Sequence, residues 1–182
     1  EQLAERMRLM RSHGMTTLSY ERHRGHSFAY DVVLAFTNYR MDDLRAALGV
    51  AQLRRLRAQN ARRAKIVKLY LRELTQVPGL IVPFNKPRGT PAYHIMPVLL
   101  PDGADRQAVM TRLRDHGIQT SIHYRPIHTF TFYKETFGAG PSLPVLDRVA
   151  PRLLTLPLYP HMTTGQVKYV ATSLMRALAG AS

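Results

Sequence analysis

The sequence predicts an α+β fold in which one long helix precedes a small domain of strands covered by helices. Three observations support this class. The stretch from Met41 to about Gln76 contains no proline and only one glycine, and short apolar runs near 92–101 and 153–160 are typical of strands. Amphipathic segments lie between and after those runs. With 182 residues, 45% of them hydrophobic, the chain is long enough to bury a core.

The N-terminal part predicts a helix, a loop and an extended segment. Apolar residues recur at helical spacing over residues 2–11, and "SHG" at 12–14 supplies a helix stop. The polar stretch 15–27 is rich in arginine and histidine, which predicts an exposed loop. The run "DVVLAF" (31–36) predicts a strand or an extended crossover.

The long helix predicted from Met41 to Gln76 has two distinct faces. Asp42 and Asp43 stand near its start, where carboxylates favour the positive end of a helix. At about 100° per residue, an apolar stripe and a basic stripe emerge. We expect the first to pack on a core and the second to face water. The apolar stripe comprises Leu53, Leu56, Ala64, Val67, Leu71 and Leu74, and the basic stripe comprises Arg54, Arg57, Lys65, Lys68 and Arg72.

The remaining sequence predicts the small domain, beginning with a strand, a helix and a strand. "AYHIMPVLLP" is too continuously apolar to be half-exposed, "DRQAVMTRLRDHGI" is amphipathic and reaches a glycine, and "IQTSIHY" alternates. Further elements follow to the C-terminus. They are a proline-punctuated loop at 125–141, a short helix at 143–150, a third strand at 153–160 and a last helix at 163–178.

The net charge of +14 raises nucleic acid as a partner, because a dense positive field attracts polyanions. The basic residues are spread over every third of the chain, which is typical of solvated faces. No RNA-binding aromatic signature, zinc-finger spacing or basic-leucine heptad accompanies them. Nucleic-acid binding is therefore not the favoured interpretation.

The composition indicates a cellular location and excludes several kinds of catalytic and metal site. No run of about 18 apolar residues and no charged-then-apolar leader is present, so we expect neither a membrane span nor a signal peptide, and a cytoplasmic location. The absence of cysteine removes disulfides, thiolate zinc sites and cysteine nucleophiles. No Ser/His/Asp arrangement, paired carboxylates or glycine-rich phosphate loop stands out. We therefore assign no catalytic residue and no metal site to this chain.

Four ligand-capable side chains gather within six residues after a predicted strand: His123, Tyr124, Arg125 and His128. Loops at strand ends often carry function. No carboxylate or third histidine nearby completes a metal site. The side chains either hydrogen-bond the loop to itself or line a pocket for an oxygen-rich ligand, with Arg125 pairing with anionic oxygens.

Asn38 and Arg40 stand at the entrance to the long helix. Asn38 could be an N-cap that satisfies a free backbone donor. Alternatively, Asn38 and the helix N-terminus together offer donors to a phosphate, and Arg40 adds a full charge. Two further histidines have simpler explanations. We assign His13 to a helix-ending turn and His94 to a strand position bonded within the core.

Four motifs, taken in order, resemble the C-terminal half of the DegT/StrS group of nucleotide-sugar aminotransferases. They are "RMRLMRSHGMT", "NYRMDDLRAALGVAQLRRL", "GIQTSIHYRPIH" and "RLLTLPLYPHMTTGQVKYV". These enzymes use pyridoxal phosphate on the fold-type I aminotransferase scaffold. The resemblance implies that residues 1–40 end the large cofactor domain with a helix and a crossover strand. Residues 41–182 would form the long interdomain helix and the C-terminal small domain, with a mostly antiparallel sheet covered by helices.

The resemblance also implies roles for the residues singled out above. The family forms dimers with active sites at the subunit interface, and Asn38 matches an asparagine that reaches toward the cofactor phosphate of the partner subunit. Arg40 is carried over beside it as a cofactor-binding residue. His123 and Tyr124 match a loop that borders the sugar-nucleotide pocket, and Arg125 and His128 are carried over as substrate-binding residues. The reaction implied is amino transfer, with glutamate as donor, to a keto-sugar nucleotide.

This sequence departs from the family pattern at two places. Phe36 stands where family members often have glycine, two positions before the asparagine. The Schiff-base lysine of the family lies upstream of the segment matching Glu1, and no lysine here occupies a matching place. We therefore expect the chain alone to be inactive and to pair as a homodimer or with an N-terminal half. Two alternatives stay open, a standalone interaction module derived from this family and a basic nucleic-acid-binding domain.

Overall fold

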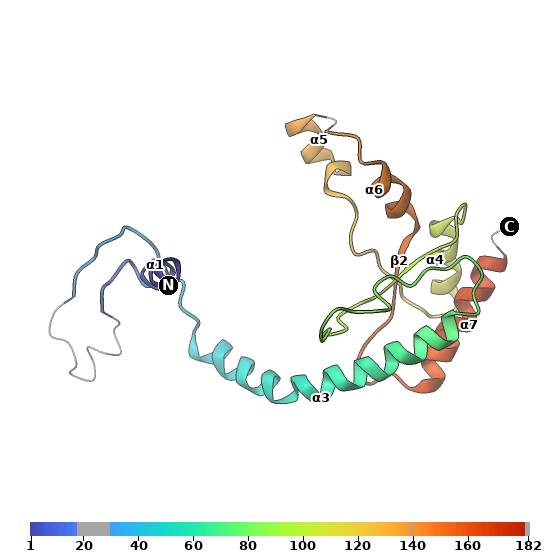
Figure 1. The fold of residues 1–182 in the computed structure, drawn as a ribbon, viewed down its shortest axis with the longest axis horizontal. Helices are drawn as coiled ribbons and strands as arrows, with labels where there is room; N and C mark the ends of the chain where they lie inside the picture. Colours follow the sequence, from blue (N-terminus) through green and yellow to red (C-terminus); the bar gives the residue numbers. More distant parts are fainter. Residues whose placement is uncertain (18–29, 139, 181–182) are drawn as a thin grey trace. The chain divides into compact units, whose positions relative to one another are not determined.

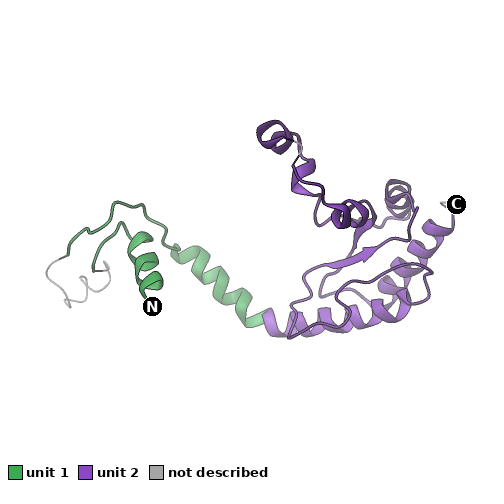
Figure 2. Cartoon of the chain, turned by 45° about the horizontal axis from the view of Figure 1, so that its top comes forward, with its two compact units in different colours: residues 1–55 green, residues 56–182 purple. Residues whose placement is uncertain are grey.

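The computed structural model describes residues 1–17, 30–138 and 140–180, and the chain divides into two units, Glu1–Arg55 and Leu56–Ser182 (Figure 2). The part of the predicted 15–27 loop from residue 18 onward lies outside the described residues. The division predicted at residue 40, between the end of a large domain and a small domain, stays a prediction. Among the described residues, no helix is long and apolar enough to cross a membrane.

Unit 1 begins with helix α1 (Gln2–Met10), as predicted (Figure 1). The helix ends in a turn in which the N–H of Gly14 donates to the carbonyl of Leu9 at 2.8 Å. Gly14 has a φ of +68°, and a Cβ on it would lie 1.8 Å from the carbonyl oxygen of Leu34. Only glycine fits at this backbone contact. His13 lies in the same turn with a φ of +62°, which agrees with its assignment to a helix-ending turn.

The prediction of a strand at 31–36 was wrong, and its alternative, an extended segment, holds. Among the described residues, the segment is paired through one isolated antiparallel bridge, Met15 with Val32, and a second bridge joins Ser12 to Asn38 just after it. A ladder needs consecutive pairs, and the turn at Gly14 interrupts the partner segment between the two bridges. The extended segment is nevertheless fixed at both ends by backbone hydrogen bonds.

Helix α3 (Asp43–Leu74) confirms the predicted long helix. All residues of the predicted basic stripe are exposed, as expected. The predicted apolar stripe was only partly right, because Leu53 and Leu56 are exposed and the buried side chains are Ile66, Tyr70 and Leu74. These three recur at i, i+4 and i+8, so the buried face exists only in the C-terminal half of the helix and is centred on other residues.

The sheet of unit 2 is built on two antiparallel strands, β1 (Met96–Leu99) and β2 (Leu153–Leu156). Met96 pairs with Leu156 and Leu99 with Leu153. One isolated bridge extends the sheet on each side, Ile81 to Leu99 and Ser121 to Thr155.

The predicted strand at 118–124 is therefore reduced to a single bridge. Ser121 and Thr155 exchange both backbone hydrogen bonds, at 3.1 and 2.8 Å. The next such pair would place Gln119 opposite Pro157, and proline has no N–H to donate. The ladder ends at that point, and the segment leaves the sheet.

The hydrophobic core of unit 2 lies between the sheet and three helices: the C-terminal half of α3, α4 (Arg106–Asp115) and α7 (Thr164–Ala179) (Figure 1). Met96 and Val98 of β1 and Leu154 and Leu156 of β2 contribute to it from the sheet. The side chain of Asp105 caps α4, and a capping box of Thr163 and Gln166 begins α7. These local signals explain why both helices begin where the sequence predicts.

The segment between Tyr124 and β2 forms four short helices: η1 (Ile127–Thr129), α5 (Thr131–Phe137), α6 (Pro144–Val149) and η2 (Ala150–Arg152). We call it the helical arm. The prediction of a loop over 125–141 was wrong for α5, whereas the helix predicted at 143–150 is present as α6. The sequence "TFYKETF" contains neither proline nor glycine, which is the signal for a helix there. No residue of these four helices is buried.

Candidate functional site

The loop of residues 123–128, which carries the predicted substrate-binding side chains, begins where the chain leaves the sheet next to β2. Thr155 of β2 is 5% exposed, and its Oγ1 lies 3.0 Å from Nδ1 of His123. The bridge between Ser121 and Thr155 holds the backbone two residues before the imidazole. His123 is therefore fixed both by the sheet and by a side-chain hydrogen bond, whereas Tyr124 beside it is 75% exposed. The Tyr124 ring packs edge-on against His123 with 4.9 Å between centroids.

Arg125 and His128 have partners within their own region of the chain. Nε and Nη2 of Arg125 donate to the side chain and the carbonyl of Thr129, at 3.0 and 3.2 Å. The Nε2 of His128 lies 3.6 Å from a carboxylate oxygen of Asp147. These contacts fit the alternative in which the side chains tie the loop to itself. A role for either residue in substrate binding stays a prediction.

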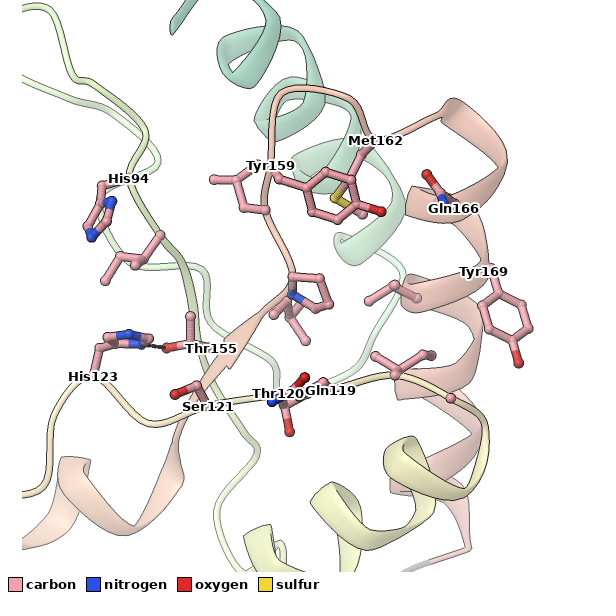
Figure 3. A pocket seen from close by; sticks show the side chains of 17 residues that line it. His94, Gln119, Thr120, Ser121, His123, Thr155, Tyr159, Met162, Gln166 and Tyr169 are labelled. Carbon is pink, nitrogen blue, oxygen red and sulfur yellow. Dashed lines mark hydrogen bonds between the residues drawn. The ribbon is translucent and has the colours of Figure 1, made fainter. Parts of the chain in front are cut away.

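A pocket of about 640 Å³ lies beside His123, between the 117–121 segment, the chain after β2 and the start of α7 (Figure 3). His123 and Thr155 form one side of it, and Tyr159 and Gln166 contribute polar groups from other parts of the chain. None of the described residues that line it is Asp, Glu, Lys or Arg. Sequence reasoning missed this pocket. The threonine within the apolar run "LLTLP" was the available signal.

His94 lines the same pocket and is exposed, so the prediction that it is bonded within the core was wrong. It precedes β1 rather than lying inside it. Its side chain is drawn above His123 in Figure 3, which places two imidazoles at one end of the pocket.

The phenol of Tyr70 supports the chain that forms one wall of this pocket. Its hydroxyl donates to the carbonyl of Pro157 at 2.9 Å, and the ring is fully buried. Burial raises the pKa of Tyr70, and the neighbouring Tyr159 raises it further. The phenol therefore stays neutral and acts as a donor that connects α3 to the segment after β2.

Asn38 and Arg40 belong to unit 1. Oδ1 of Asn38 accepts the backbone N–H of Arg40 at 3.0 Å, and Nε of Arg40 donates to Oγ of Ser12 at 3.2 Å. The interpretation of Asn38 as the cap of α3 was wrong, because Oδ1 of Asp42 accepts the N–H of Arg45 at 2.9 Å at the helix start. With Asp42 at that position, the N-terminus of α3 is occupied by a carboxylate and is unsuited to a phosphate.

The described parts of the chain contain no group of three or more histidine or carboxylate side chains placed to hold a metal ion.

Comparison with known proteins identifies the family. The DegT/DnrJ/EryC1/StrS aminotransferase family matches residues 1–175. The spore coat polysaccharide biosynthesis protein SpsC of Bacillus subtilis is 34% identical over 187 residues, covering 100% of this chain and 48% of SpsC. The chain thus spans about half the length of the curated relatives it matches.

Solved structures agree with this match and with the predicted fold class. The aminotransferase TlmJ from Streptoalloteichus hindustanus is 32% identical with a TM-score of 0.79, covering 98% of this chain and 45% of TlmJ. The PMP-form of Spr1654 from Streptococcus pneumoniae has a TM-score of 0.85 at 22% identity, covering 100% of this chain and 46% of that one, and this likeness concerns the fold alone. The resemblance inferred from four sequence motifs is confirmed. The chain belongs to the DegT/DnrJ/EryC1/StrS aminotransferase family.

Proposed function

We propose that the chain forms the C-terminal portion of a pyridoxal-phosphate-dependent aminotransferase that transfers an amino group from glutamate to a keto-sugar nucleotide. The observation that carries the proposal is the family match over residues 1–175. The name of SpsC, a polysaccharide biosynthesis protein, and the PLP-form in which Spr1654 was solved support the substrate class and the cofactor. Because the chain spans about half of these relatives, the activity is proposed for the complete enzyme.

On the substrate side, His123 and Tyr124 supply the hydrogen-bonding groups. An imidazole and a phenol can both donate to hydroxyl and phosphate oxygens, and both side chains follow a fixed point of the sheet. Two of the three guanidinium nitrogens of Arg125 are committed to Thr129, and the remaining one can contact an anionic oxygen. The imidazole of His128 also carries an N–H that can donate to an oxygen. These four residues would orient the sugar nucleotide.

On the cofactor side, the chemistry of Asn38 and Arg40 fits a phosphate. The Oδ1 of Asn38 is already used as an acceptor within the chain, which leaves the amide N–H groups as donors. The guanidinium of Arg40 adds donors and a positive charge. We further propose that the complete enzyme pairs as a dimer, in which these groups would contact the phosphate held by the partner subunit. Pyridoxal phosphate, when bound in the complete enzyme, serves as the electron sink of the amino transfer.

The first test compares the chain with the complete enzyme. The 182-residue chain mixed with pyridoxal phosphate should give no new visible absorbance band that borohydride abolishes, because the Schiff-base lysine is proposed to lie outside it. The complete enzyme should give such a band and should aminate a keto-sugar nucleotide in a glutamate-dependent reaction. A borohydride-sensitive band from the chain alone would show that one of its own lysines binds the cofactor.

A variant in the complete enzyme tests the substrate role. Replacing His123 with alanine should lower kcat/KM for the keto-sugar nucleotide by about tenfold or more, since an oriented hydrogen bond is lost. Thr172→Val on the exposed face of α7 is the matched control and should leave kcat/KM unchanged. An unchanged kcat/KM in the His123 variant would remove His123 from the substrate site.

A further inference from the structure

The hydrogen bond between Thr155 and His123 constrains the position of the imidazole ring and also which of its nitrogens carries the proton. Thr155 is 5% exposed, so its hydroxyl proton needs an acceptor inside the protein. Nδ1 of His123, 3.0 Å away, is the one acceptor in hydrogen-bond reach of this hydroxyl among the described residues. Leaving a buried hydroxyl proton without an acceptor costs free energy. The favourable arrangement is therefore the one in which Thr155 donates and Nδ1 accepts.

This direction of donation determines where the imidazole carries its own proton. A neutral imidazole has one N–H and one bare nitrogen. If Nδ1 accepts the hydroxyl proton of Thr155, the ring proton must be on Nε2. Nε2 has no hydrogen-bond partner among the described residues, and His123 lines the 640 Å³ pocket. The ring therefore presents a hydrogen-bond donor, and not a basic nitrogen, to whatever approaches it.

The rest of the pocket indicates which ligand this donor meets. The described lining residues include hydroxyl and amide side chains and two tyrosines but no carboxylate, lysine or arginine (Figure 3). Such a lining suits the neutral, oxygen-bearing part of a ligand better than a diphosphate, which would call for paired cations. An Nε2–H donor matches a hydroxyl, carbonyl or ring oxygen.

We infer that Thr155 is a positioning residue that holds His123 in its Nε2–H tautomer, so that the imidazole donates a hydrogen bond to a neutral oxygen of the ligand in this pocket. His123 then orients the ligand and does not act as a general base. The identity of the ligand as the sugar of a keto-sugar nucleotide rests on the proposed function. The assignment of the Nε2–H tautomer is independent of the proposed function.

The tautomer is tested on the 182-residue chain by ¹⁵N and ¹³C NMR of histidine side chains, at a pH well above the ordinary imidazole pKa of about 6.5. His123 should show a protonated Nε2 and an Nδ1 whose ¹⁵N shift reports an accepted hydrogen bond. Thr155→Val should move the Nδ1 shift toward that of a free nitrogen, and Thr155→Ser should retain it. Thr172→Val is the control and should leave both shifts unchanged. A protonated Nδ1 in the unsubstituted chain, or an Nδ1 shift unaffected in the valine variant, would overturn the inference.

Kinetics of the complete enzyme separate positioning from a general loss of structure. Thr155→Val should raise KM for the keto-sugar nucleotide about tenfold with kcat changed less than about threefold, because the contact orients the ligand in ground and transition states alike. Thr155→Ser should restore KM. A kcat that collapses with KM unchanged would mean that His123 acts in the chemical step, which contradicts the inference. A complete enzyme that aminates no keto-sugar nucleotide refutes the proposed function and leaves the NMR result standing.

Discussion

The two units of the chain differ in what holds them together. The buried hydrophobic side chains among the described residues all belong to unit 2, where β1, β2 and three helices enclose them. Among the residues of unit 1 that the structure describes, the buried ones are Ser12 and Gly14, and their contacts are chiefly backbone hydrogen bonds around the turn at Gly14. Unit 2 thus has a hydrophobic core of its own, whereas unit 1 is organised by its backbone.

Unit 1 also exposes large apolar side chains. Leu44 is 86% exposed, Leu53 is 67% exposed and Leu3 is 72% exposed. Exposed apolar groups at this density mark surfaces that contact other protein. The exposed apolar side chains of unit 1 are compatible with the prediction that residues 1–40 end the large cofactor domain, which stays a prediction. Helix α3 takes part in both units. Its C-terminal half packs in the core of unit 2, whereas its N-terminal half has no buried residue.

The largest expected effect is the difference in the free energy of unfolding between an alanine substitution in unit 2 and one in unit 1. Leu154→Ala removes a fully buried side chain of β2 and should lower the free energy of unfolding by about 2–5 kcal/mol. Leu48→Ala, at a position that is 61% exposed, should change it by less than about 0.5 kcal/mol. Urea denaturation of the 182-residue chain, followed by circular dichroism, measures both. Equal losses would mean that unit 1 has a core that stabilises the chain.

A smaller effect is expected at the point where α4 meets the end of the helical arm. Nη1 of Arg106 donates to the carbonyls of Ala150 and Leu153, at 2.6 and 3.2 Å, and burial lowers the pKa of Arg106. Arg106→Met leaves both carbonyls without this donor and should cost about 1–3 kcal/mol of unfolding free energy. The exposed Arg114→Met is the control, for which urea denaturation should show almost no change.

The smallest effect is expected at Tyr70. Tyr70→Phe loses the hydrogen bond to Pro157 and should cost about 1 kcal/mol near neutral pH. Because burial raises the pKa of this phenol, the folded state favours the neutral form. That contribution is complete below the ordinary tyrosine pKa of about 10 and is lost as the pH rises above it. The advantage of the unsubstituted protein over Tyr70→Phe should therefore shrink between pH 8 and pH 10.5 in urea denaturation.

Tyr133→Phe serves as the control for this pH dependence. Tyr133 is 41% exposed, and its hydroxyl makes no hydrogen bond to the described residues. The substitution should leave unfolding free energy nearly unchanged at both pH values. A pH dependence of the Tyr70→Phe difference with the opposite sign would mean that the phenol is not buried in its neutral form.

Local signals in the sequence predicted most of the helices of this fold. The helix predicted from Met41 to Gln76 is α3, and the helices predicted at 143–150 and 163–178 are α6 and α7. The predictions were wrong where contacts between segments distant in the sequence determine the local structure. The sequence does not reveal that a ladder continued beyond the Ser121–Thr155 bridge would bring Pro157 opposite Gln119, so the predicted strand is reduced to one bridge. Nor does helical spacing alone show that Ile66 and Tyr70, rather than Leu53 and Leu56, meet the sheet.

The sequence motifs predicted which residues form the candidate site, but not which residues hold them in position. The motif "HYRPIH" drew attention to His123 and its neighbours, and their assignment to the substrate, like that of Asn38 and Arg40 to the cofactor, stays a prediction. The threonine in "LLTLP" was visible in the sequence, but its pairing with His123 was not, because that pairing depends on an antiparallel bridge between segments more than thirty residues apart. Hydroxyl residues within apolar strands are therefore worth testing as partners of nearby histidines.

The helical arm follows His123 and Tyr124 directly, yet none of the residues in its four helices is buried. Insertions and deletions there cost little folding free energy, because each doubling of a loop's length adds only about 0.6 kcal/mol of closure entropy. The arm can thus diversify in length and composition during evolution while Ser121 and Thr155 keep the preceding residues in place. Relatives that accept different substrates are accordingly expected to vary most between the positions matching Pro126 and Pro151, and least in the paired strands.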